Sequence, residues 1–173
     1  HAAIYTHHEE DSNHEDLIDA YSSLILPETH IGLFSLYEAQ TISQERDTIE
    51  TSALALISSG CDYALITGTG TGSQQRAFQN SFFGAQGLVK NYRWEQEAIA
   101  NDGAATTLAM ANASYIAHGL DAQHAVAQAQ NFTWQAMRAS RDLGCNQRTP
   151  HRFYWADKNI QEVGTLPAQK NAH

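Results

Sequence analysis

The sequence predicts an α/β fold with a mostly parallel sheet and helices on both faces. Short apolar segments typical of buried strands alternate with segments whose apolar residues recur at helical spacing. A hairpin pattern and two further helical segments follow this alternation. The 173 residues suffice for one ordinary core, and we find no linker or internal repeat among them. We therefore expect a single domain over residues 1–160 and a polar tail over residues 161–173.

The first half of the chain is predicted to contain three strands and three helices. The expected strands are residues 2–6, 31–34 and 63–66. The expected helices are residues 17–26, which Pro27 ends, residues 35–40, and a third helix that Asp47 caps and Gly60 stops.

Residues 7–16 are rich in histidine and acidic side chains. Such side chains are metal-ligand types. Adjacent ligands on a loop do not fix a coordination geometry, however. The favoured interpretation is a solvated loop that leads into a helix N-terminus, where acidic residues complement the helix dipole.

The second half is predicted to contain a hairpin and two long helices. Residues 78–83 and 88–94 read as strands around the turn at 84–87. The alanine-rich residues 103–118 form a helix that Gly119 ends, and Asp121 caps the last helix.

Composition excludes several classes of protein. Apolar residues make up 42% of the chain and charged residues 17%, as in globular proteins. A net charge of −9 argues against nucleic-acid binding, and no apolar run is long enough to span a bilayer. Cys61 and Cys145 are too few for a disulfide framework, so we expect two free thiols and a cytoplasmic location.

Two glycine-containing turns are candidates for phosphate binding. Residues 67–72 directly follow a predicted strand, and their glycines would let backbone amides approach an anion. No Lys-Ser or Lys-Thr follows and the next segment is a predicted strand, which excludes the Walker loop and the dinucleotide fingerprint. A flexible strand-to-hairpin turn is an equal alternative.

The second turn, residues 101–107, opens the alanine-rich helix. A helix N-terminus presents unpaired amides and a positive dipole end to an anion. Plain capping of the helix by Asn101 or Asp102 is the favoured alternative here.

Several segments match the pattern of one known family in order and spacing. They are residues 17–21, 24–27, 36–39, 62–68, 103–108, 119–121, 125–129, 144–150 and 153–154. Together they resemble the C-terminal portion of the hydroxymethylpyrimidine and phosphomethylpyrimidine kinases, members of the ribokinase-like superfamily. The family's N-terminal part has no counterpart in these 173 residues.

The resemblance implies a ribokinase-like fold and ATP-dependent phosphorylation of a hydroxymethyl or phosphomethyl pyrimidine in thiamine biosynthesis. It implies Mg²⁺ as a second cofactor, with Glu38 as the acidic residue near the metal. The turn near the phosphates would be formed by Thr67 and Gly68. The anion hole would be formed by the amides of Gly103, Ala104, Ala105 and Thr106.

The chain departs from the family pattern at three of these positions. Thr106 stands where the family has a catalytic Cys or Asp, Ala105 replaces the second glycine of the anion hole, and Ser35 replaces an asparagine. A threonine hydroxyl is no general base at neutral pH, so Asp102 is the nearest candidate carboxylate.

These departures leave three hypotheses open. The chain is an active kinase or the major fragment of one, a degenerate relative without phosphoryl transfer that serves as a ligand-binding, regulatory or assembly module, or a kinase with pyridoxal kinase-like specificity. The three departures favour the degenerate relative, and we expect a slow or inactive kinase. The expected partner is a small pyrimidine substrate, with no nucleic acid and no membrane, and a homodimer is left open as the assembly.

Overall fold

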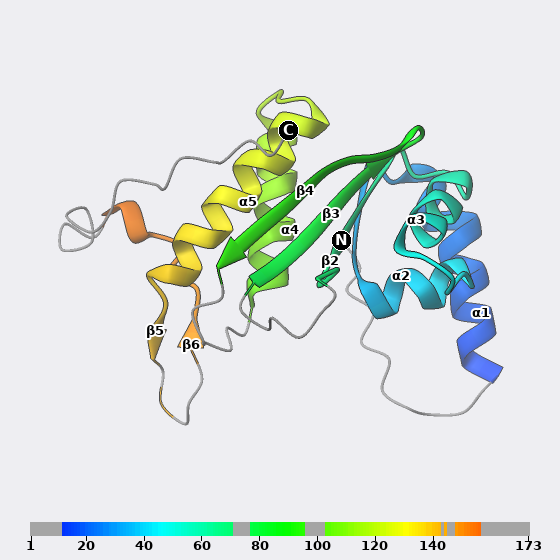
Figure 1. Ribbon diagram of the computed structural model, residues 1–173, viewed down its shortest axis with the longest axis horizontal. Coiled ribbons are helices and arrows are strands. Elements are labelled where there is room, and N and C mark those ends of the chain that lie inside the picture. Colours follow the sequence, from blue (N-terminus) through cyan, green and yellow to red (C-terminus); the bar gives the residue numbers. More distant parts are fainter. Residues whose placement is uncertain (1–11, 71–76, 96–102, 143, 145–147, 157–173) are drawn as a thin grey trace. The chain divides into compact units, whose positions relative to one another are not determined.

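The computed structural model describes residues 12–70, 77–95, 103–142, 144 and 148–156 (Figure 1). The chain divides into two compact units. The first unit comprises residues 1–98 and 120–124, and the second comprises residues 99–119 and 125–173.

The first unit contains a four-stranded sheet with the strand order β1-β2-β3-β4. Its strands are β1 (Ile31–Ser35), β2 (Tyr63–Thr67), β3 (Ala77–Gly84) and β4 (Gly87–Glu95). This confirms the expected strands at 31–34 and 63–66 and the hairpin, whereas the expected strand at 2–6 lies outside the described residues.

The sheet is mixed, so the expected predominance of parallel pairing holds only for β1 with β2. The β2–β3 and β3–β4 pairs are antiparallel. The physical reason is the tight turn between Gly84 and Gly87, because strands joined by a hairpin must run in opposite directions.

Helical segments precede and follow β1. They are α1 (Ser12–Ala20), the π-helical turn η1 (Tyr21–Ile25), the 3₁₀ turn η2 (Leu26–Glu28), α2 (Leu36–Ser43) and α3 (Ile49–Ser58). The expected helix at 17–26 thus starts earlier and changes its hydrogen bonding at Tyr21. Pro27 lies inside the 3₁₀ turn, where its missing N–H costs no helical bond.

The cap of α3 is Thr48, so the expected cap at Asp47 is wrong by one residue. Thr48 Oγ1 accepts a hydrogen bond from Thr51 N at 3.0 Å, and Thr48 N donates to Thr51 Oγ1 at 3.1 Å. This reciprocal capping box fixes the start of the helix. Gly60 ends this region with φ +120°, as expected, and a Cβ there would lie 2.7 Å from Pro27 Cα.

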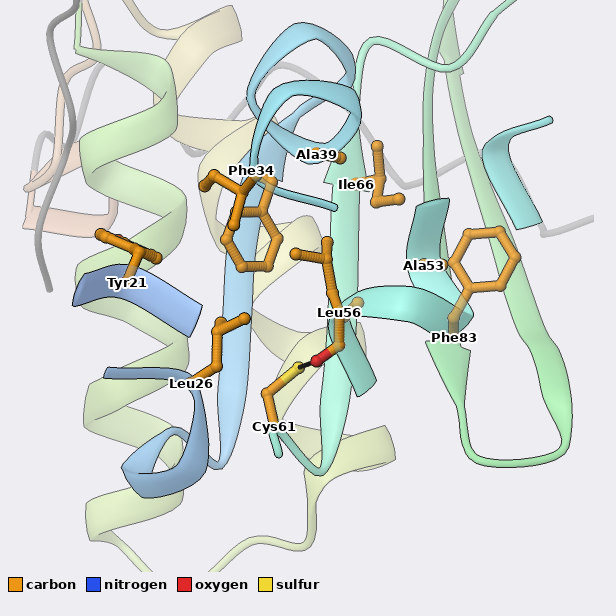
Figure 2. Packing of buried hydrophobic residues seen from close by; sticks show 11 residues of the cluster. Tyr21, Leu26, Phe34, Ala39, Ala53, Leu56, Cys61, Ile66 and Phe83 are labelled. Carbon is orange, nitrogen blue, oxygen red and sulfur yellow. Dashed lines mark hydrogen bonds between the residues drawn. The ribbon is translucent and has the colours of Figure 1, made fainter. Parts of the chain in front are cut away.

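The core of the first unit lies between the sheet and the helices α2 and α3 (Figure 2). Its buried members are Tyr21, Leu26, Phe34, Ala39, Ile42, Ala53, Leu56, Cys61, Ala64, Ile66 and Phe83. Leu65 and Phe82, whose side chains alternate with those of this core along their strands, are also fully buried.

Cys61 is a buried free thiol, which confirms that part of the cysteine expectation. Its Sγ donates to Leu56 O at 3.4 Å (Figure 2). Burial, and secondarily the Asp62 carboxylate, raises the pKa of the Cys61 thiol to about 11, so it stays protonated at neutral pH. Cys145 lies outside the described residues.

The second unit holds α4 (Ala104–Ala117) and most of α5 (Ala122–Arg138). The two-stranded ribbon of β5 (Arg141–Asp142) and β6 (Arg148–Thr149) and the 3₁₀ turn η3 (Tyr154–Ala156) follow. The expected stop at Gly119 is confirmed by its φ of +88°. The expected cap of α5 is confirmed by Asp121 Oδ1, which accepts from His124 N at 3.0 Å.

Among the residues that the structure describes, no helix has the length and apolar character needed to cross a membrane. The expected tail at 161–173 lies outside these residues, and the single domain over 1–160 stays a prediction.

We predict that Leu56→Ala lowers the free energy of unfolding by about 2–5 kcal/mol, because it removes a fully buried side chain and leaves a cavity. Urea unfolding followed by circular dichroism measures the change. Leu24→Ala is the matched control, since Leu24 is 70% exposed, and it should stay within about 0.5 kcal/mol of the parent. Equal effects of the two substitutions would contradict the described core.

Candidate functional site

The parallel pairing of β1 and β2 brings two of the predicted site segments to one edge of the sheet. Ser35 is the register partner of Thr67, and each residue ends its strand. The first turn of α2, which carries Glu38, and the turn at Gly68 therefore both leave from the carboxyl ends of these strands. In open α/β sheets this edge is where ligands usually bind.

Glu38 lies at the third position of α2 and completes a capping box with Ser35. Ser35 N donates to Glu38 Oε2 at 2.7 Å, and Glu38 N donates to Ser35 Oγ at 3.2 Å. The serine that replaces the family's asparagine thus acts as a helix cap. Burial, and secondarily the Glu38 carboxylate, raises the pKa of Tyr21 above its usual value.

One carboxylate oxygen of Glu38 can take a metal without sharing its site with a hydrogen-bond donor of the described residues. Oε2 is bound in the capping box, and Oε1 accepts no hydrogen bond from any residue that the structure describes. The described ranges contain no group of three metal-ligating side chains. Glu38 therefore fits Mg²⁺ only in the mode that uses one carboxylate together with phosphate oxygens and waters.

The turn after β2 is anchored by hydrogen bonds rather than loose. Thr67 Oγ1 donates to Phe34 O at 3.2 Å, and Gly68 N donates to Asn80 Oδ1 at 3.3 Å. Thr69 is buried, and its N–H donates to Gln79 O at 2.9 Å. These contacts anchor residues 67–69, and whether the rest of the turn is flexible is not tested by the described residues.

The same hydrogen bonds occupy donors that a phosphate would need. The Thr67 hydroxyl and the Gly68 amide already have protein acceptors. The Thr69 hydroxyl lies 2.8 Å from Ser81 Oγ. Binding of phosphate by Thr67 and Gly68 stays a prediction that requires these bonds to be exchanged, and residues 71 and 72 lie outside the described residues.

The N-terminus of α4 is organised differently from the expected cap. Gly103 occupies the N-cap position with φ +88°, so the helix begins later than capping by Asn101 or Asp102 requires. Thr107 N donates to Gly103 O at 2.9 Å and closes the first helical turn. Glycine has no side-chain oxygen and tolerates this left-handed conformation, which explains the choice of residue.

The predicted anion hole therefore has open amides. The N–H groups of Ala104, Ala105 and Thr106 have no acceptor among the described residues. The side chains of Ala105 and Thr106 are exposed. Three amides at the positive end of a 14-residue helix favour an anion.

Of the two predicted catalytic residues, the structure describes Thr106 but not Asp102. Thr106 lies in the first turn of α4, and its hydroxyl makes no hydrogen bond with any described residue. Asp102 lies outside the described residues, so its role stays a prediction.

Sequence reasoning missed Arg152. Its Nε donates to Thr107 Oγ1 at 3.1 Å, and its Nη2 lies 3.5 Å from the position that a Cβ on Gly103 would occupy. Arg152 and Thr107 are 45 residues apart, so no local sequence pattern predicts that they are in contact.

The available sequence signal was charge. In the full sequence, residues 99–119 and 125–173 of the second unit hold six lysine and arginine residues against four acidic residues, in a chain of net charge −9. The arginines are Arg138, Arg141, Arg148 and Arg152.

Comparisons with solved structures identify the same fold in several kinases. The chain is 22% identical to the pyridoxal kinase from Staphylococcus aureus in complex with ADP, with a TM-score of 0.69. That match covers 78% of this chain and 52% of the kinase chain. For the ADP complex of Bacillus subtilis pyridoxal kinase the identity is 19%, the TM-score 0.65 and the coverage 86% and 55%.

A Bacteroides thetaiotaomicron protein provisionally assigned as a phosphomethylpyrimidine kinase, crystallised with pyridoxal, matches with 14% identity and a TM-score of 0.65. That match covers 96% of this chain and 58% of the other. The chain thus spans about half the length of the solved structures that it matches. Their likeness confirms the α/β, ribokinase-like fold.

The comparison with curated protein sequences found no match. The model of the phosphomethylpyrimidine kinase family, in contrast, matches residues 3–151, which is most of the chain. This chain belongs to the phosphomethylpyrimidine kinase family.

Proposed function

We propose that this chain is the nucleotide-binding part of an ATP-dependent kinase that phosphorylates the hydroxymethyl group of a pyrimidine. The observation that carries the proposal is the set of open amides at the start of α4, next to Gly103. These are the positions that the family resemblance assigns to the anion hole. Family membership and structural neighbours crystallised with ADP or AMP-PCP support the proposal.

The chemistry matches what these amides offer. The substrate hydroxyl oxygen forms a bond to the γ-phosphorus of ATP, the bond from that phosphorus to the bridging oxygen breaks, and ADP leaves. Negative charge spreads over the γ-phosphoryl oxygens, and fixed N–H donors stabilise it. The hydroxyl proton must pass to a base, which Thr106 cannot be at neutral pH.

Mg²⁺ is part of the proposal, held by Glu38 through its remaining carboxylate oxygen. When bound, Mg²⁺ would supply positive charge that offsets the negative charge of the nucleotide phosphates. The capping box fixes the Glu38 side chain in one orientation, so this single ligand is positioned in advance.

A second candidate substrate is pyridoxal, because several structural neighbours are pyridoxal kinases and one was solved with both AMP-PCP and pyridoxal. Pyridoxal and hydroxymethylpyrimidine share a hydroxymethyl group on a nitrogen heterocycle. The match to the phosphomethylpyrimidine kinase family favours the pyrimidine over pyridoxal, and with it a role in thiamine biosynthesis.

A cytoplasmic location is also part of the proposal and is supported by the free thiol of Cys61.

We predict saturable binding of ADP and AMP-PCP that Ala105→Asp weakens at least tenfold, because a carboxylate in the first turn of α4 repels phosphate. The substitution should not harm folding, since acidic residues stabilise a helix N-terminus. Titration calorimetry measures the affinity. Ala113→Asp, at an exposed position further along α4, is the matched control. No binding by the parent chain would overturn the proposal, and equal affinities would overturn the placement of the phosphates.

We predict that Glu38→Gln leaves thermal stability nearly unchanged but raises the Mg²⁺ concentration needed for half-maximal nucleotide binding. Glutamine keeps an oxygen for Ser35 N and loses the charge that attracts the cation. Titrating Mg²⁺ at fixed ADP measures the effect. Glu45→Gln, an exposed site, is the control. An unchanged Mg²⁺ dependence in Glu38→Gln would show that the metal is held elsewhere.

We predict slow or undetectable phosphorylation of hydroxymethylpyrimidine by the parent chain and a faster rate in Thr106→Asp, alone or combined with Ala105→Gly. A general base typically contributes a factor of about 10²–10⁴, and aspartate supplies one where threonine does not. Thr106→Asn is the matched control, because it has a similar shape and no basic group. Fast turnover by the parent that Asp102→Asn abolishes would assign the base to Asp102 instead.

A further inference from the structure

The guanidinium of Arg152 is attached to the same turn of α4 that carries the open amides. Its Nε donates to Thr107 Oγ1 at 3.1 Å, and that hydroxyl in turn donates to Gly103 O at 2.8 Å. Thr107 is only 2% exposed, whereas Arg152 is exposed, so the hydrogen bond between them is part-buried. The two bonds fix the position of the planar group relative to the N-cap of the helix.

Most N–H donors of Arg152 make no hydrogen bond to a described residue. A guanidinium has five N–H donors, and the Nε contact uses one of them. Among the described residues, Arg152 has no further hydrogen bond and no ion pair. The fork of a guanidinium without a carboxylate partner among the described residues matches the geometry of phosphate.

Neighbouring arginines are engaged within their own segment. Arg148 Nη2 donates to Ser140 O at 2.9 Å, and Arg141 Nη2 lies 3.1 Å from His151 Nε2. Arg152 instead reaches the start of α4, with Nη2 3.5 Å from the Cβ position of Gly103. Arg152 is exposed, so its terminal nitrogens are open to solvent and to a ligand at the start of the helix.

We propose that Arg152 binds the phosphate oxygens of the nucleotide at the start of α4. The inference rests on the proposed function, which supplies the nucleotide. It adds a positively charged, bidentate donor to a site otherwise built from neutral amides. The alternative anion, the phosphate of a phosphorylated pyrimidine, is distinguished by using ADP and inorganic phosphate as separate probes.

The test measures binding of ADP, AMP-PCP, adenosine and inorganic phosphate by calorimetry. A hydrogen bond to a charged group is typically worth a factor of about 10–100 in affinity, so Arg152→Gln should weaken ADP and AMP-PCP by that factor. Adenosine, which lacks phosphate, should bind as to the parent. Arg152→Lys should fall between the two, because an ammonium keeps the charge and loses the fork. Arg46→Gln, an exposed arginine of the first unit, controls for the loss of one charge.

Each remaining outcome decides against the inference. Unchanged ADP affinity in Arg152→Gln, with the parent binding ADP, overturns the inference and leaves the proposed function standing. A loss confined to inorganic phosphate assigns Arg152 to the other anion. A parallel loss of adenosine binding and of melting temperature shows a merely structural role. A parent chain that binds no ADP or AMP-PCP overturns the proposed function and this inference with it.

Discussion

The parallel pairing of β1 with β2 is the constraint on which the first unit depends. It sets Ser35 opposite Thr67, so that the first turn of α2 and the turn at Gly68 leave the sheet at one edge. The core beneath the sheet holds this register, because a shift by one residue would turn Phe34 and Ile66 out of it. Packing on α2 and α3 thus fixes where α2, the helix that carries Glu38, begins.

In the second unit the corresponding constraint is the backbone conformation of Gly103. A φ of +88° at the N-cap lets α4 begin without a side-chain oxygen, and the next three amides have no acceptor among the described residues. Thr107 then links this turn to Arg152 by bonding to both. One glycine and one buried hydroxyl therefore determine where α4 begins and where the Arg152 side chain is anchored.

Several sequence predictions differ from the structure by one or two residues, for a common reason. Asp47, Asn101 and Asp102 are all good cap residues, yet Thr48 and Gly103 occupy the N-cap positions. Cap propensity is similar for several polar residues, so the hydrogen-bond partner three residues later decides, as Thr51 does for Thr48. The local pattern locates the turn and leaves the exact residue to geometry.

The sequence by itself determined the α/β class, the family and most strands, because buried strands, hairpin turns and glycine stops leave local patterns. It also predicts Glu38 and the start of α4 as site segments, and this stays a prediction. Only the tertiary structure showed that one carboxylate oxygen of Glu38 accepts a capping hydrogen bond. It also showed that Thr67 and Gly68 donate to protein acceptors and that Arg152 donates to Thr107. These are contacts between atoms, several of them from residues far apart in the chain, and no pattern of neighbouring residues encodes them.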